Sequence, residues 1–180
     1  MTSTANTATR AVRAAIESDT QHGAVVPPLH LSSNFAFAGF GDKREYDYTR
    51  SGNPTRDALA GALTELEHGA GAVVTSSGMA ALTLVCQLLQ PGDLLVAPHD
   101  CYGGSYRLFE SLAAKGHFEV AFVDQTSPAA LREVCNRKPR LILVETPSNP
   151  LLRIVDIAEV VRLAGEAGAL LAVDNTFLSP

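Results

Sequence analysis

The chain has 180 residues, a net charge of −5 and a hydrophobic fraction of 46%. Its length suits one domain with a sizeable core, and its acidic balance argues against a nucleic-acid binder, which needs clustered lysine and arginine. No run is long and apolar enough to span a membrane, and no apolar signal core lies in residues 1–20, so a cytoplasmic protein with no membrane partner is expected. The three cysteines form no C-x-x-C pair, which argues against a metal site.

Residues 1–60 form an irregular segment in which only a short helix over 10–18 is expected. Such a segment rarely folds alone, so we interpret it as an N-terminal arm that makes contacts between subunits. The arm contains the stretch YDYTRSGNPTR at 46–56, where Tyr48 and Arg50 stand beside a glycine turn. Phenols and a cation in this arrangement are candidate phosphate ligands, and a solvated loop with a surface arginine is the alternative.

From residue 61 to residue 180, short β-rich runs alternate with helical patterns. This alternation predicts βαβ units, and therefore an α/β fold with a mostly parallel sheet and helices on both faces. Ligands gather at the carboxyl ends of such strands, so functional residues are expected there. The expected strands are 72–75, 94–97, 119–123, 141–145 and 170–173, and the expected helices are 56–67, 79–89, 106–115, 128–137 and 157–166.

The first expected strand leads into the sequence SSGMA, which contains Gly78 and Met79 at the start of a helix. Small residues leave backbone N–H groups open at a helix N-terminus, and that arrangement suits a phosphate. Taken alone, the pattern is better explained by a serine N-cap followed by a turn glycine.

The second expected strand leads into HDCYGGSYR at 99–107. Tyr102 could stack on a flat ring, and Arg107 could bind a carboxylate through two hydrogen bonds. The histidine at 99 is interpreted as structural. After the fourth strand comes ETPSNP, where Asn149 offers both a donor and an acceptor, although a plain proline turn is the alternative.

The last expected strand ends at Asp174, within the sequence VDNT. A carboxylate at the end of a buried strand is costly unless it has a partner. That partner could be a protonated ring nitrogen or, alternatively, nearby backbone donors. Each of these signals is weak alone, but together they place a phosphate cup, a stacking ring and a ring-nitrogen partner at one edge of a sheet.

The motifs YTRSGNPTR, SSGMA, HDCYGGSYRLF, ETPSNPLL and VDNTF, in this order, resemble the Cys/Met-metabolism family of pyridoxal 5'-phosphate (PLP) enzymes, which have fold type I, the aspartate-aminotransferase-like fold. The resemblance implies that PLP is the cofactor and assigns a role to each matching residue. Gly78 and Met79 would bind its phosphate, and Tyr102 would stack on its ring and assist proton transfer. Asp174 would pair with the ring nitrogen. Asn149 and Thr176 would contact the ring.

The resemblance also implies a homotetramer, in which Tyr48 and Arg50 reach the PLP phosphate of a neighbouring subunit. Arg107 would face the distal carboxylate of the substrate. The implied reaction is γ-replacement, in which O-succinyl-L-homoserine and L-cysteine give L-cystathionine and succinate for methionine biosynthesis. Ser51 is the form common in the γ-lyases of the family, so a γ-lyase or an O-acylhomoserine sulfhydrylase stays open as an alternative.

The lysine that such enzymes join to PLP lies in an S-x-T-K motif. This chain has Lys43, Lys115 and Lys138, and none of them stands in that context. We therefore expect residues 61–180 to be the first part of a PLP-binding large domain that stops before this Schiff-base lysine. The chain alone is expected to have little or no activity, and a role through subunit contacts only is a further alternative.

Overall fold

The computed structural model describes residues 6–179, which divide into two compact units at the Val74–Thr75 bond. The first unit contains helices α1 (Thr7–Arg13) and α2 (Pro54–Leu66). The second contains the remaining helices and all strands assigned among the described residues. The domain boundary expected at residue 60 falls inside α2.

Both helices of the first unit begin at an asparagine N-cap. The Asn6 side chain accepts a hydrogen bond from Thr9 N at 2.9 Å and starts α1. The helix expected over 10–18 therefore begins earlier. It also ends earlier, because Ala15 and Glu17 have φ values of 57° and 70° that an α-helix excludes. Asn53 is the N-cap of α2 and is followed by Pro54, an order that is common at helix N-termini.

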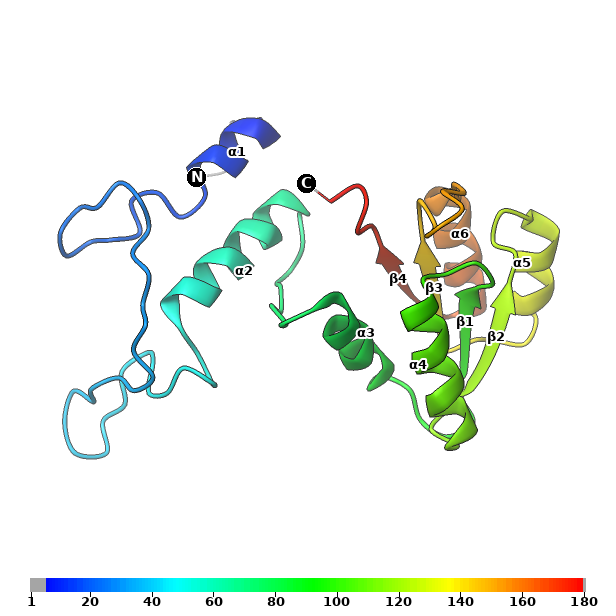
Figure 1. Cartoon of the computed structure of the whole chain (residues 1–180), viewed down its shortest axis with the longest axis horizontal. Helices are drawn as coiled ribbons and strands as arrows, with labels where there is room; N and C mark the ends of the chain where they lie inside the picture. Colours follow the sequence, from blue (N-terminus) through cyan, green and yellow to red (C-terminus); the bar gives the residue numbers. More distant parts are fainter. Residues whose placement is uncertain (1–5, 180) are drawn as a thin grey trace. The chain divides into compact units, whose positions relative to one another are not determined.

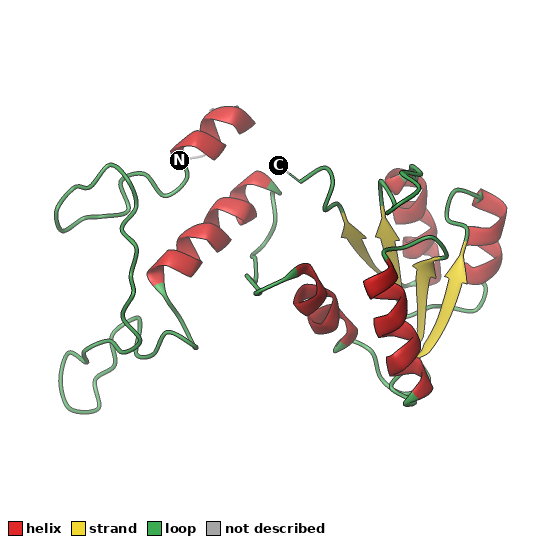
Figure 2. Ribbon diagram, in the orientation of Figure 1, coloured by secondary structure: helices red, strands yellow, loops and turns green. Residues whose placement is uncertain are grey.

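The second unit is a parallel sheet of four strands in the order β2-β1-β3-β4 (Figures 1 and 2). Parallel strands need crossover helices, and each strand-to-strand connection here contains one, so the predicted α/β class is confirmed. The elements are α3 (Gly78–Cys86), β1 (Leu94–Pro98), α4 (Gly103–Ala114), β2 (Glu119–Val123), α5 (Pro128–Cys135), β3 (Leu141–Glu145), α6 (Ile157–Ala167) and β4 (Leu170–Asp174).

Two apolar clusters, one on each face of the sheet, make the core. Strand residues alternate between faces, so Val96 and Ile142 join one cluster while Leu95 and Leu143 join the other. The first cluster packs against α5 and α6, and the second against α3 and α4, where Phe109 is buried. The unit therefore has three layers. β1 and β3 lie in the centre and are buried along their length.

The predicted strand at 72–75 is wrong. No strand is assigned there, and the side chain of Val73 is 76% exposed. A short apolar run becomes a strand only where a neighbouring strand satisfies its backbone N–H and C=O groups. Within residues 6–179, the sheet contains only the strands β2, β1, β3 and β4, so the run at 72–75 has no such neighbour. Over the same described range, no helix is long and apolar enough to cross a membrane.

Candidate functional site

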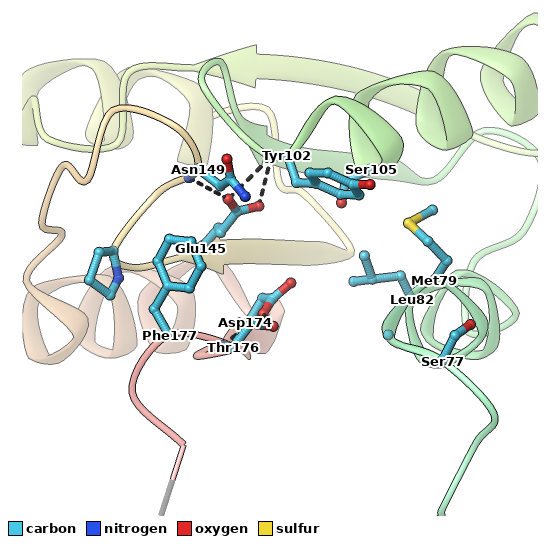
Figure 3. A pocket seen from close by; sticks show the side chains of 12 residues that line it. Ser77, Met79, Leu82, Tyr102, Ser105, Glu145, Asn149, Asp174, Thr176 and Phe177 are labelled. Carbon is cyan, nitrogen blue, oxygen red and sulfur yellow. Dashed lines mark hydrogen bonds between the residues drawn. The ribbon is translucent and has the colours of Figure 1, made fainter.

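A pocket of about 280 Å³ lies at the carboxyl end of the sheet, within the second unit (Figure 3). Residues that follow β1, β3 and β4 line it, together with the start of α3, so the rule about strand ends locates the site. The lining residues are Ser77, Gly78, Met79, Leu82, Tyr102, Ser105, Glu145, Pro147, Asn149, Asp174, Thr176 and Phe177.

The N-terminus of α3 supplies one wall of the pocket. Ser77 is the N-cap, and its hydroxyl accepts a hydrogen bond from Ala80 N at 3.1 Å. The first backbone N–H groups of a helix have no partner within the helix, and the helix dipole favours an anion beside them. Gly78 and Met79 belong to this first turn and line the pocket, and their role as a phosphate site stays a prediction.

Tyr102 lies opposite α3 and is the N-cap residue of α4. Its aromatic ring covers Gly104. A Cβ atom added to Gly104 would lie 3.0 Å from Tyr102 Cδ1 and 3.1 Å from the Met79 sulfur. Only a glycine therefore leaves room for the ring in this position. Tyr102 is 46% exposed as a residue, so it is accessible to a planar ligand.

Glu145 is a pocket residue to which the sequence had given no role. It ends β3, is 5% exposed, and accepts hydrogen bonds from two loops. Its Oε1 accepts from Tyr102 N at 3.1 Å and from Asn149 N at 2.8 Å, and its Oε2 accepts from Tyr102 N at 2.9 Å. Burial raises the pKa of the Glu145 carboxyl above its usual value, and these hydrogen bonds oppose the shift.

Polar contacts to neighbouring loops hold the loop that carries Asn149 in place. Ser148 donates from its hydroxyl to Asp100 Oδ2 at 2.7 Å, and Arg153 N donates to the Ser148 hydroxyl at 3.2 Å. The guanidinium of Arg153 in turn binds both carboxylate oxygens of Asp124, at 3.1 and 2.9 Å. A chain of polar contacts therefore runs from the loop after β2 to the loop after β3 and limits the movement of Asn149.

This chain of polar contacts predicts a dependence of stability on pH. Hydrogen bonds from Thr126 and Arg153 lower the pKa of Asp124 to about 2, below the value of about 3.9 in an unfolded chain. The pair therefore stabilises the fold above about pH 4, and this contribution is lost as the pH falls toward about 2. Because Asp124 is 41% exposed, Asp124→Asn is expected to lower the unfolding free energy at neutral pH by at most about 1 kcal/mol.

Urea unfolding of Asp124→Asn and the wild type at a series of pH values measures this effect. The difference between the two proteins should shrink as the pH falls. Glu133→Gln, a change at an exposed residue of α5, is the matched control and should show no such trend. A difference between Asp124→Asn and the wild type that stays constant down to acidic pH would contradict the prediction.

Asp174 ends the edge strand β4 and faces the pocket beside Thr176 and Phe177. Its Oδ1 accepts a hydrogen bond from Thr176 N at 3.1 Å, and the Thr176 hydroxyl donates to the same oxygen. Asp174 is half-buried, and Thr176 donates both of these hydrogen bonds to the same oxygen, Oδ1. It can therefore accept a further hydrogen bond from a cationic group in the pocket.

Three predicted residues lie outside the pocket lining. Arg107 is exposed on α4, where its Nη1 would lie 3.3 Å from a Cβ added to Gly103. Tyr48 and Arg50 belong to the first unit, and the guanidinium carbon of Arg50 lies 4.9 Å from the centre of the Tyr48 ring. Both are exposed, and their proposed contact with a phosphate stays a prediction.

The arrangement fits a flat, anionic ligand that carries a basic ring nitrogen. The helix N-terminus complements the anionic group of such a ligand, and the carboxylate complements its ring nitrogen. The aromatic side chain between them can stack on its ring. The Ser105 hydroxyl lines the same pocket, is buried and has no hydrogen-bond partner among the described residues, so it can serve a ligand. In this part of the chain no three histidine, cysteine or acidic side chains gather as a metal site would require.

Comparison with known proteins gives consistent results. The model of the Cys/Met metabolism PLP-dependent enzyme family matches residues 8–180. The cystathionine γ-synthase of Escherichia coli (strain K12) is 62% identical over 174 residues, which are 96% of this chain and 45% of that protein. The chain thus spans about half the length of the curated relatives it matches.

Solved structures agree with this result. A cystathionine γ-synthase from Xanthomonas oryzae in complex with cystathionine is 60% identical, has a TM-score of 0.96, and is matched over 99% of this chain and 46% of its own. A cystathionine γ-lyase from Micromonospora echinospora is 40% identical, with a TM-score of 0.90 and a match over 98% of this chain and 46% of its own. Of these two structures, the synthase from Xanthomonas oryzae is therefore the more similar to this chain in both sequence and fold.

Proposed function

Because the chain belongs to the Cys/Met metabolism PLP-dependent enzyme family, we propose that its pocket is the PLP site of a cystathionine γ-synthase. The reaction is γ-replacement on O-succinyl-L-homoserine by L-cysteine, which gives L-cystathionine and succinate. The observation that carries the proposal is the gathering of Gly78, Met79, Tyr102, Asn149 and Asp174 around one pocket, in a chain that is 62% identical to such a synthase.

The pocket residues fit PLP by their chemistry. Bound PLP acts as an electron sink that stabilises negative charge on substrate carbon atoms. The N–H groups at Gly78 and Met79 would bind its phosphate. Tyr102 would lie against its ring and exclude water from that face, and it would assist proton transfer through its hydroxyl. Asn149 and Thr176 would contact the edge of the ring.

Asp174 would keep the ring nitrogen of PLP protonated. A carboxylate at hydrogen-bond distance favours the protonated form of a basic nitrogen, and the partly buried position of Asp174 strengthens this effect. The hydrogen bonds from Thr176 to Asp174 Oδ1 hold the carboxylate in one orientation. Arg107 would bind the distal carboxylate of the substrate, and its exposure leaves the guanidinium available for that contact.

The assembly proposed with this function is a cytoplasmic homotetramer. In it, Tyr48 and Arg50 of one subunit would contact the PLP phosphate of another. Both side chains are exposed, and the guanidinium carbon of Arg50 lies 4.9 Å from the centre of the Tyr48 ring. This exposure and this proximity support the proposed role.

A γ-lyase is the second candidate, and Ser51 is the observation that favours it. Its hydroxyl donates to Asp47 Oδ1 and to Tyr48 O, both at 2.8 Å, so it shapes the turn that carries Tyr48 and Arg50. The lower identity of the cystathionine γ-lyase from Micromonospora echinospora, 40%, weighs against this candidate.

Product analysis of the full-length protein tests the function. With O-succinyl-L-homoserine and cysteine, a synthase is expected to form cystathionine, and omission of cysteine should abolish that product. A γ-lyase would instead degrade cystathionine, and a sulfhydrylase would prefer sulfide to cysteine. Among the residues that the structure describes, no lysine lines the pocket, so the 180-residue chain by itself is expected to give little or no turnover in the same assay. Turnover by the isolated chain would contradict that expectation.

A further inference from the structure

Glu145 stands out among the pocket residues by its charge and its burial. Of the residues that line the pocket, Glu145 and Asp174 alone are charged. A buried carboxylate is costly, and the cost is higher here because Asp174 and Asp100 add negative charge nearby. Burial, Asp174 and Asp100 act together to raise the pKa of Glu145. A group kept at such a cost in a pocket is a candidate for a functional role.

The hydrogen bonds of Glu145 join two separate parts of the pocket wall. Tyr102 follows β1 and Asn149 follows β3, and the residues are distant in sequence. Glu145 Oε1 accepts from both backbone N–H groups, at 3.1 and 2.8 Å, while Oε2 accepts from Tyr102 N at 2.9 Å. Figure 3 shows the carboxylate between the two loops, with its contacts drawn as dashed lines. The Glu145 side chain therefore ties the pocket-lining residues of the two loops together, in addition to the hydrogen bond that Ser148 makes with Asp100.

The position of the Tyr102 ring follows from the position of its backbone. The ring packs so closely over Gly104 that a single added methyl group would collide with it, and it also lies near the Met79 sulfur. The ring therefore has little freedom to compensate for a shift of its own main chain. A displacement of Tyr102 N would move the face on which a planar ligand stacks.

A carboxylate meets the needs of this position better than an amide. Both of its oxygens accept hydrogen bonds, and each acceptor is aimed at a backbone N–H. In Glu145→Gln one oxygen becomes an NH₂ group. Whichever way the amide turns, that donor faces either Tyr102 N–H or the pair of N–H groups at Tyr102 and Asn149. Two N–H groups that face each other repel, so the loop that carries the backbone N–H would move away from the side chain.

We propose that Glu145 is a positioning residue, which holds Tyr102 and Asn149 at the separation required to bind PLP between the two loops. The inference rests on the proposed function. Glu145 does not need to touch the cofactor for this role. It acts through the main chain of the residues that do.

The test compares the PLP dissociation constant of the full-length wild type with that of Glu145→Gln, followed by quenching of tyrosine fluorescence. The variant is expected to bind PLP about tenfold more weakly, the loss expected for one charged hydrogen bond. The visible circular dichroism of bound PLP is the second readout. It reports the asymmetric surroundings of the ring, and it should decrease in Glu145→Gln at saturating PLP.

A destabilised variant with an intact pocket separates positioning from general stability. Leu131→Ala removes a buried side chain of α5 from the cluster on the other face of the sheet, and Leu131 does not line the pocket. It should lower the thermal midpoint without changing PLP affinity or dichroism. Glu110→Gln, at an exposed residue of α4, controls for the loss of a carboxylate. If Glu145→Gln does not fold, Glu145→Asp replaces it and should shift both readouts in the same direction.

The outcomes are distinguishable. Wild-type affinity and dichroism in Glu145→Gln would overturn the inference while the proposed function stands. Equal weakening of PLP binding in Glu145→Gln and Leu131→Ala, at equal thermal midpoints, would also overturn it, because stability alone would then explain the loss. Failure of the wild-type protein to bind PLP would overturn the proposed function and this inference with it.

Discussion

Asp174→Asn is expected to lower kcat/KM for cystathionine formation roughly 10²–10³-fold, which corresponds to the loss of one charge-stabilising group in an active site. The substitution keeps the shape of the side chain and an acceptor for Thr176 N, which lies 3.1 Å from Oδ1. It removes the negative charge. A neutral amide no longer favours a proton on the ring nitrogen of PLP, so the cofactor withdraws electrons less effectively.

Steady-state kinetics of the full-length enzyme with O-succinyl-L-homoserine and cysteine measures this effect. Asp93→Asn is the matched control. Asp93 precedes β1 at the opposite end of the sheet, where its carboxylate accepts a hydrogen bond from Gln90 N at 2.8 Å. The control should keep wild-type kcat/KM. A value for Asp174→Asn within about twofold of the wild type would rule out the assigned role, because a charge of this kind contributes far more.

Phe109→Ala is expected to destabilise the fold by about 3–5 kcal/mol, the usual cost of deleting a buried aromatic ring. Phe109 is 1% exposed and joins α4 to the sheet through the cluster that contains Leu95, Ala97 and Leu143. The cavity left by the ring cannot collapse easily, because strand residues form its floor. The same helix begins at the turn that carries Tyr102, so the loss would also loosen one wall of the pocket.

Urea unfolding of the full-length protein without PLP gives this free energy. Glu110→Ala, an exposed change on the same helix, should stay within about 0.5 kcal/mol of the wild type. If Phe109→Ala also stayed within that range, α4 could not be held to the sheet in the way that the structure shows.

Much of the fold follows from local sequence because its strands are short, apolar and clearly bounded. The expected strands 119–123 and 141–145 coincide with β2 and β3. The run at 72–75 has a similar composition and does not form a strand. Composition describes a segment alone, whereas a strand depends on a neighbour that is distant in sequence. Information of that kind is absent from a local pattern.

Part of the candidate site also follows from the local sequence, and part depends on contacts between distant residues. The positions of Tyr102, Asn149 and Asp174 in one pocket follow from the rule that ligands bind at the carboxyl ends of parallel strands. Glu145 is not among the residues that the motifs predict for the site, although its strand contains a signal. The strand LILVE is apolar up to its last residue, so its glutamate had to be buried with the strand and needed partners. The same argument applies to Asp174 at the end of β4. The identity of the partners, two backbone N–H groups from separate loops, requires the three-dimensional structure.

The contact between Glu145 and its two loops involves only main-chain N–H groups of Tyr102 and Asn149. Every residue type except proline carries such a donor, so mutation at either position exchanges the chemical group presented to a substrate without breaking the anchor. The scaffold and the reactive surface can therefore diverge independently. A pocket built in this way is suited to acquiring new substrates, since altered chemistry at positions 102 and 149 does not require a rebuilt frame.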